Sequence, residues 1–100
     1  MKARMLKSQH TEENTIFVAA LRDRREALGL RQADLAKRLG QTQVTISRVE
    51  NGERKLDYME LRTWLRALRV APVSFVRQLE RKLNDRAARS EERRVGKECQ

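Results

Sequence analysis

The chain has 100 residues, so it is long enough for one domain but not for two, each with its own core. Hydrophobic residues make up 39% of it and aromatic residues only 4%, which suits a small helical core. The net charge of +9 favours a polyanionic partner, with nucleic acid ahead of an anionic membrane surface. One cysteine and one histidine exclude a structural zinc site and an intramolecular disulfide, so we expect neither metal nor cofactor.

No membrane or export signal is visible in the sequence. The longest apolar run covers residues 16–21, which is too short to span a bilayer. No charged segment is followed by a long apolar stretch and a small-residue cleavage site. We therefore expect a cytoplasmic protein without a membrane partner.

Residues 1–10 are polar and basic without periodicity, and we interpret them as a flexible basic arm. Thr11 can cap a helix whose first turn holds Glu12 and Glu13, where carboxylates suit the helix dipole. This helix is expected to run to about Leu28 and to stop at Gly29. Its predicted apolar face consists of Phe17, Ala20, Leu21 and Leu28, and arginines 22, 24 and 25 crowd the rest of its surface.

Two short helices are predicted next, over residues 32–39 and 43–50. Gly40 suits a left-handed end to the first, and Thr42 can cap the second. An alternation of apolar and polar residues over 43–49 also resembles a strand, but the flanking glycine and cap favour a helix.

The last two helices have clear start signals. Asp57 with Glu60 three residues later resembles a capping box, and predicts a helix to about Leu68. Pro72 suits the first turn of a fifth helix, whose apolar face fades after about Arg86. Five short helices joined by tight turns predict an all-α bundle.

The C-terminal segment reads differently from the rest. Residues 89–99 resemble the in-frame translation of a sequencing adapter, so we interpret residues 87–100 as a disordered, artefactual tail and assign Cys99 no function. The alternative is a genuine solvated charge run. Removing the four basic and three acidic residues from position 89 onward leaves a net charge of +8, so the charge argument survives.

Residues 32–51 have the pattern of two helices crossing steeply at a short turn. Ala36 gives the second helix room to pass, and Gly40 tolerates the positive φ of the turn. Four apolar residues would lock the pair to the remaining helices: Leu35, Leu39, Ile46 and Val49. The exposed face of the second helix then carries the groups that read base edges in the major groove, namely Gln43, Val44, Thr45, Ser47 and Arg48.

From Thr15 to Leu83 the chain resembles the phage-repressor/Cro-like helix-turn-helix family, also called the xenobiotic-response-element type. A Gln opens the first motif helix, Leu-Ala lies in its middle, and Ile-Ser-x-x-Glu-x-Gly closes the second. The resemblance implies a five-helix lambda-repressor-like DNA-binding domain over residues 11–86, with its motif at 32–51. It also implies a homodimer on a double-stranded operator, with the second motif helix in the major groove.

The resemblance also implies site residues. Gln32 would contact a phosphate, and Thr42 and Gln43 would begin the recognition helix. Base edges would be read by Val44, Thr45 and Arg48. Asn51, Arg54 and Lys55 would meet the DNA backbone. The family often pairs an arginine of its first helix with the glutamate that ends the recognition helix, here Arg25 and Glu50.

Three positions depart from the family pattern. Arg31 stands where Ser or Thr usually caps the first motif helix, which forfeits about 1 kcal/mol. Gln41 stands where an apolar residue is commoner, so the turn should pack less tightly. Arg69 stands where Gly usually ends the fourth helix, and a left-handed Arg costs about 1 kcal/mol.

Alternatives remain for single residues. Val44 could belong to the core, and Arg25 and Glu50 could be separate solvated charges. Trp64 and Phe17 could be stacking platforms for single strands, although core packing is the favoured interpretation. The fifth helix offers a dimer seam through Phe75, Val76, Leu79 and Leu83, unless the two leucines pack back on the first helix.

We interpret the chain as a transcriptional regulator, specifically a repressor, that lies with the nucleoid through DNA binding. The first alternative is an antitoxin that binds a small toxin protein and represses its own operon. The second is an interaction scaffold that has lost DNA binding. The sequence shows no paired acid and base, so we expect no enzymatic activity.

Overall fold

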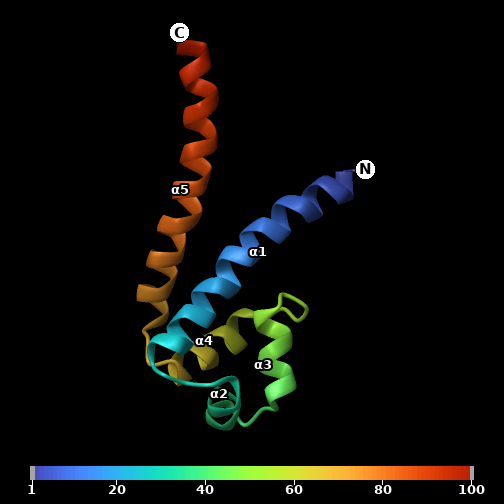
Figure 1. Ribbon diagram of the computed structural model, residues 1–100, viewed down its shortest axis with the longest axis vertical. Helices are drawn as coiled ribbons and strands as arrows, with labels where there is room; N and C mark the ends of the chain where they lie inside the picture. The colour runs from blue at the N-terminus through green and yellow to red at the C-terminus, as the bar shows by residue number, and fades with distance from the viewer. Residues whose placement is uncertain (1, 100) are drawn as a thin grey trace.

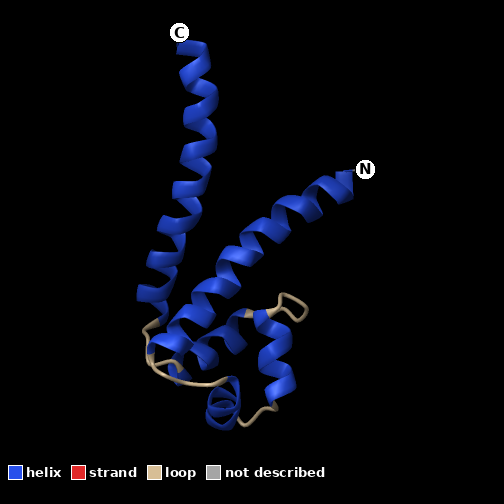
Figure 2. Cartoon of the chain, in the orientation of Figure 1, coloured by secondary structure: helices blue, strands red, loops and turns tan. Residues whose placement is uncertain are grey.

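The computed structural model describes the backbone of residues 2–99 and the side chains of residues 12–86. It contains five helices: α1 (Lys2–Ala27), α2 (Gln32–Leu39), α3 (Gln43–Glu50), α4 (Tyr58–Ala67) and α5 (Pro72–Cys99). The three short helices cluster at one end of the molecule, and the long α1 and α5 diverge from that cluster (Figure 1). Backbone 2–99 contains no strand (Figure 2), so the all-α prediction is confirmed and the strand alternative for residues 43–49 is wrong.

The core lies where all five helices meet. Its fully buried side chains come from α1, α2, α3 and α4 and from the residue after α4, and include Leu21, Leu35, Ile46, Leu65 and Leu68. Phe75 closes the core from α5, with its ring edge-on to that of Phe17 at a centroid distance of 6.3 Å. Trp64 is buried in the same cluster and Phe17 is partly buried against it, so both pack in the core and neither is a stacking platform.

The two motif helices have the predicted bounds, and local caps explain why. Gly40 takes the left-handed conformation with φ 65°, and the Gln41 N–H donates to the Ala36 carbonyl at 2.9 Å. Thr42 accepts a hydrogen bond from the Thr45 backbone N–H at 3.3 Å, as an N-cap should. Gly40 therefore ends α2 and Thr42 begins α3, each through its own conformation or side chain.

The two long helices exceed their predicted lengths. α1 begins at Lys2 and not at Thr11, and α5 continues to Cys99 and not only to Arg86. Neither Gly nor Pro occurs between residues 2 and 27 or between residues 73 and 95, so no residue breaks either helix. The division into arm, domain and tail stays a prediction, and the side chains of Thr11 and Cys99 lie outside the described residues.

The end of α4 shows how the fold tolerates an arginine in place of glycine. Arg69 has φ 57°, as predicted from its position. Arg24 of α1 donates from Nε to the Leu68 carbonyl at 3.0 Å and from Nη2 to the Arg69 carbonyl at 2.7 Å. Arg38 of α2 donates to the Ala67 carbonyl at 2.9 Å. Side chains from two other helices thus satisfy the carbonyls that a helix end leaves unpaired.

The start of α2 lacks a side-chain cap, as the sequence predicts. An Arg31 side chain offers only donors, so it cannot accept from the first N–H groups of α2. Asp34 provides the reciprocal contact, because its carboxylate accepts the Arg31 backbone N–H at 2.8 Å. The Arg31 guanidinium in turn lowers the pKa of the Asp34 carboxyl group through a side-chain hydrogen bond.

Candidate nucleic-acid interface

Helix α3 presents one apolar face to the core and one polar face outward. Ile46 and Val49 are fully buried among the core residues. Val44 is 58% exposed, so the interpretation of Val44 as a core residue is wrong. Gln43 and Arg48 are exposed with it, and Thr45 and Ser47 are half-buried. The geometry gives α3 an accessible surface that ends at Asn51.

Hydrogen bonds across this surface are few. The hydroxyl groups of Thr42 and Thr45 lie 3.2 Å apart, and the Asn51 side-chain amide donates to the Ser47 hydroxyl at 3.4 Å. The side chains of Gln43 and Arg48 make no hydrogen bond to any residue whose side chain the structure describes. Their donors and acceptors therefore remain available to an external partner.

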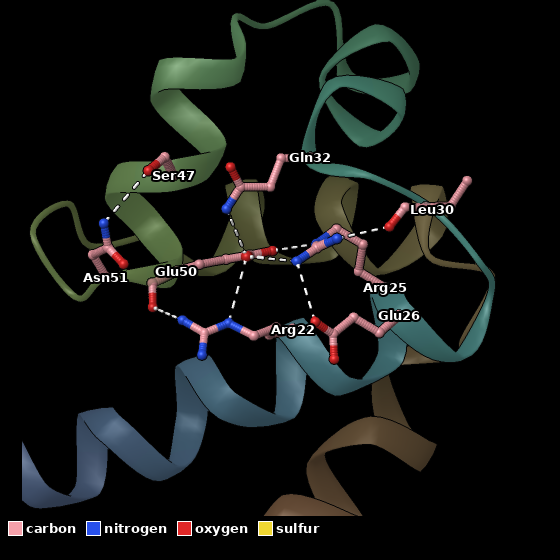
Figure 3. A network of polar contacts seen from close by, with 8 residues as sticks. All are labelled: Arg22, Arg25, Glu26, Leu30, Gln32, Ser47, Glu50 and Asn51. Carbon is pink, nitrogen blue, oxygen red and sulfur yellow. Dashed lines mark hydrogen bonds and ion pairs between the residues drawn. The ribbon is translucent and has the colours of Figure 1, made fainter.

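The C-terminal end of α3 is held in place by a buried ion pair (Figure 3). Arg25 of α1 donates to both Glu50 carboxylate oxygens, at 2.7 and 3.0 Å, and also to the Leu30 carbonyl at 2.7 Å. Arg25 is 8% exposed and Glu50 only 2%, so the alternative of two solvated charges is wrong. The hydrogen bond to Glu50 raises the pKa of the Arg25 guanidinium.

Two further side chains complete this cluster. The Gln32 amide donates to Glu50 Oε1 at 3.0 Å, which links the start of α2 to the end of α3. Arg22 donates from Nη2 to the Glu50 carbonyl at 3.0 Å, and its Nε lies 3.6 Å from Glu50 Oε1 (Figure 3). The role of Arg22 was not predicted, because its partner lies 28 residues away in the sequence. Only the recurrence of arginines along α1 hinted at it.

The residues predicted to meet the DNA backbone are placed differently from one another. Asn51 and Lys55 are exposed, whereas half-buried Gln32 already uses one amide N–H on Glu50. Arg54 forms an ion pair with Glu60 at 2.9 Å. The pKa of Glu60 is lowered, first by the hydrogen bond from the Asp57 backbone N–H and then by Arg54. The structure thus packs α3 against α1 and α2, and leaves the predicted contacts unequally accessible.

Within the part of the chain that the structure describes, none of the helices combines the length and apolar character of a membrane span. The same residues contain no group of three or more potential metal-ligating side chains among His, Cys, Asp and Glu.

The chain is similar in sequence and structure to proteins of one known family. A helix-turn-helix family model matches residues 21–75. An XRE-family like protein from Pseudomonas syringae pv. tomato is 32% identical, with a TM-score of 0.71 over 78% of this chain and 95% of its own. The regulator ClgR of the clp gene from Corynebacterium glutamicum is 22% identical, with a TM-score of 0.68 over 83% and 88% of the two chains.

A third solved structure has the same fold. The restriction-modification controller protein C.Esp1396I is 23% identical, with a TM-score of 0.68 over 73% of this chain and 95% of its own. No curated protein matches the chain. The family match covers more than half of the chain and includes both motif helices and the buried Glu50. The chain therefore belongs to the XRE family of helix-turn-helix DNA-binding transcription regulators.

Proposed function

We propose that this protein binds double-stranded DNA in a sequence-specific manner by placing α3 in the major groove. The observation that carries this proposal is the outward face of α3, where Gln43, Val44 and Arg48 are exposed beside a fully packed inner face. A major groove about 12 Å wide admits a helix and presents a distinct donor and acceptor pattern for each base pair.

The side chains on this face match the chemistry of base edges. An arginine can donate two hydrogen bonds to guanine, and a glutamine can pair in both directions with adenine. A branched apolar side chain such as Val44 can contact the thymine methyl group. Arg48, Gln43 and Val44 can therefore read guanine, adenine and thymine, respectively. Thr45 and Ser47 add hydroxyl groups to the same face. Around them, the backbone contacts would come from Gln32, Thr42, Asn51, Arg54 and Lys55.

Selection of bound duplexes from a randomised pool tests this proposal directly. We expect enrichment of a defined sequence of a few base pairs per half-site, above the level obtained with the Arg48→Ala variant. Retention of every sequence in equal measure would contradict sequence-specific reading, because only backbone contacts bind all sequences alike.

We also propose that the protein acts as a homodimer, with α5 at the dimer interface. The predicted seam needs correction, because Phe75 is buried in the core and Leu79 packs against it. Over residues 72–86 of α5, whose side chains the structure describes, the exposed large apolar residues are instead Val73, at 67%, and Val76, at 37%. A dimer would double the length of the recognised site and space its half-sites about one helical turn apart.

Sedimentation on and off the DNA tests the dimer. Val73→Glu with Val76→Glu should give a folded monomer that binds an isolated half-site normally and a full site weakly. Arg77→Glu, at an exposed position of the same helix, is the control for added negative charge. A wild-type protein that sediments as a monomer on its full site would contradict the dimer.

A regulator of this kind acts as a repressor when its site overlaps a promoter, because the bound protein excludes the polymerase. A reporter gene behind the selected site would show lower expression in the presence of the protein. The antitoxin alternative predicts instead a stable complex with a small toxin protein, and cytoplasmic localisation suits both functions.

A further inference from the structure

A cavity of about 360 Å³ opens between α1 and the turn that follows α3. Its wall on α1 includes Asn14 and Arg22, and its wall on the turn includes Asn51, Gly52 and Lys55. The two walls touch, because a Cβ atom at Gly52 would lie 3.2 Å from the Asn14 side-chain amide nitrogen. The cavity therefore adjoins Asn51, the residue at which the outward face of α3 ends.

The groups around this cavity are mainly hydrogen-bond donors. Arg22 and Lys55 contribute two positive charges, and the two asparagines contribute side-chain amides. The one acidic residue in the wall is Glu50, whose side chain is only 1% exposed. Because Arg25 and Gln32 already donate to both of its carboxylate oxygens, Glu50 offers little repulsion to an anion.

Arg22 is held in a position that suits anion binding. Its Nη2 is fixed on the Glu50 carbonyl, while the Arg22 side chain as a whole remains 43% exposed. One terminal nitrogen has no partner among the residues drawn in Figure 3. A guanidinium fixed on one side and open on the other loses less conformational entropy on binding a phosphate than a free one.

We propose that this cavity binds a phosphate group and that, in the complex, the group is a backbone phosphate of the DNA. This inference rests on the proposed function, and it adds Arg22 and Asn14 of α1 to the contact surface. The shape of the site favours a phosphate over a planar carboxylate, because the donors come from two walls and not from one edge. Lys55 then acts as a partner of Arg22 and not as an isolated contact.

The salt dependence of DNA binding tests the site through variants. Arg22→Gln and Lys55→Gln should each reduce the slope of log K against log salt concentration by about one unit, on specific and random duplexes alike. Arg66→Gln is the matched control, because Arg66 is an exposed α4 residue outside the cavity, and its slope should equal that of the wild type. A folded Arg22→Gln variant with an unchanged slope would overturn the proposal.

A second measurement uses the wild-type protein, so it does not depend on how the variants fold. Pyrophosphate is titrated into the protein at constant ionic strength while the side-chain amide resonances of Asn14 and Asn51 are followed by NMR. We expect both to shift and a DNA duplex to reverse the shift. Shifts without any change in the Arg22→Gln slope would assign the cavity to a free phosphorylated ligand and overturn the DNA contact. Absence of any shift would overturn the site.

The two proposals fail in different ways. If the wild type bound no duplex of any sequence, yet pyrophosphate shifted both amides, the proposed function would be wrong and the phosphate site would stand. If the duplex bound with sequence preference while both variants kept the wild-type slope, the function would stand and this cavity would be excluded from the interface.

Discussion

The arginines of α1 and the polar side chains of α3 are close in space but differ in what they bind. Arg22, Arg24 and Arg25 all donate to backbone carbonyls, and Arg25 also forms the buried pair with Glu50. Gln43 and Arg48 on α3 bind no described side chain or carbonyl. A high count of basic residues thus does not measure the charge available to DNA, because part of it fixes the ends of helices.

We therefore assign stability mainly to Arg24 and Arg25 of α1, and base recognition to the outward face of α3. The α1 arginines tie α1 to the ends of α3 and α4 and hold α3 at a fixed angle. The exposed side chains of α3, Gln43 and Arg48, form no contacts on which the fold depends. Changes at Arg24 or Arg25 should lower the free energy of unfolding, and changes on the outward face of α3 should alter DNA binding alone. Arg22 has both roles, because it binds the Glu50 carbonyl and lines the proposed phosphate site.

The largest effect is expected from breaking the buried pair. Arg25→Gln leaves Glu50 buried without its bidentate partner, and should lower the free energy of unfolding by about 3–5 kcal/mol. Urea denaturation followed by circular dichroism measures this change. Arg62→Gln, at an exposed position of α4, should change it by less than about 0.5 kcal/mol. A similar, small loss of unfolding free energy in both variants would show that the Arg25–Glu50 pair does not stabilise the fold.

A smaller effect of opposite sign is expected at the end of α4. Arg69→Gly relieves a left-handed arginine and should stabilise the fold by about 1 kcal/mol, since Arg24 still reaches the carbonyl of residue 69. Arg66→Gly, inside the same helix, should instead destabilise it by about 1 kcal/mol. Thermal unfolding of both variants separates the two positions. Destabilisation by Arg69→Gly would mean that the strain is offset by contacts of the arginine side chain.

The smallest effect concerns Arg54, which stands between the two regions. Glu60→Gln keeps an acceptor for the Asp57 backbone N–H but removes the charge that binds Arg54, an exposed pair that solvent screens. The freed arginine should raise DNA affinity on all sequences and steepen the salt slope. Glu53→Gln removes an equal charge from the same turn without freeing Arg54. If both variants gained equally, net charge alone would explain the change.

Sequence reasoning succeeded where the signal was local. Gly40 and Thr42 end and begin the motif helices through their own conformations, so the bounds of α2 and α3 were predictable. The family resemblance also identified the Arg25–Glu50 pair. By contrast, the carbonyls bound by Arg22 and Arg24 lie 28 and 44 residues further along the chain, and no periodic pattern encodes such contacts.

Two other features depend on packing in the same way. Phe75 and Leu79 were predicted in the dimer interface together with Val76, but Phe75 is buried in the core and Leu79 packs against it, which leaves Val76 exposed. The ion pair of Arg54 with Glu60 was not foreseen, because it depends on how the turn after α3 folds back on α4; the contact of Arg54 with the DNA backbone stays a prediction. The sequence specifies which side chains a helix presents, whereas the packing of helices decides which of them remain free.

The most direct test of this division is the ratio of affinities for the selected site and for random DNA, measured for wild type and Arg48→Ala at one salt concentration. Arg48→Ala should cost about 1–3 kcal/mol on the selected site, little on random DNA and almost nothing in the free energy of unfolding. The ratio should therefore fall while the fold is unchanged. Equal weakening on both duplexes would contradict base reading by α3, and would place Arg48 among the backbone contacts.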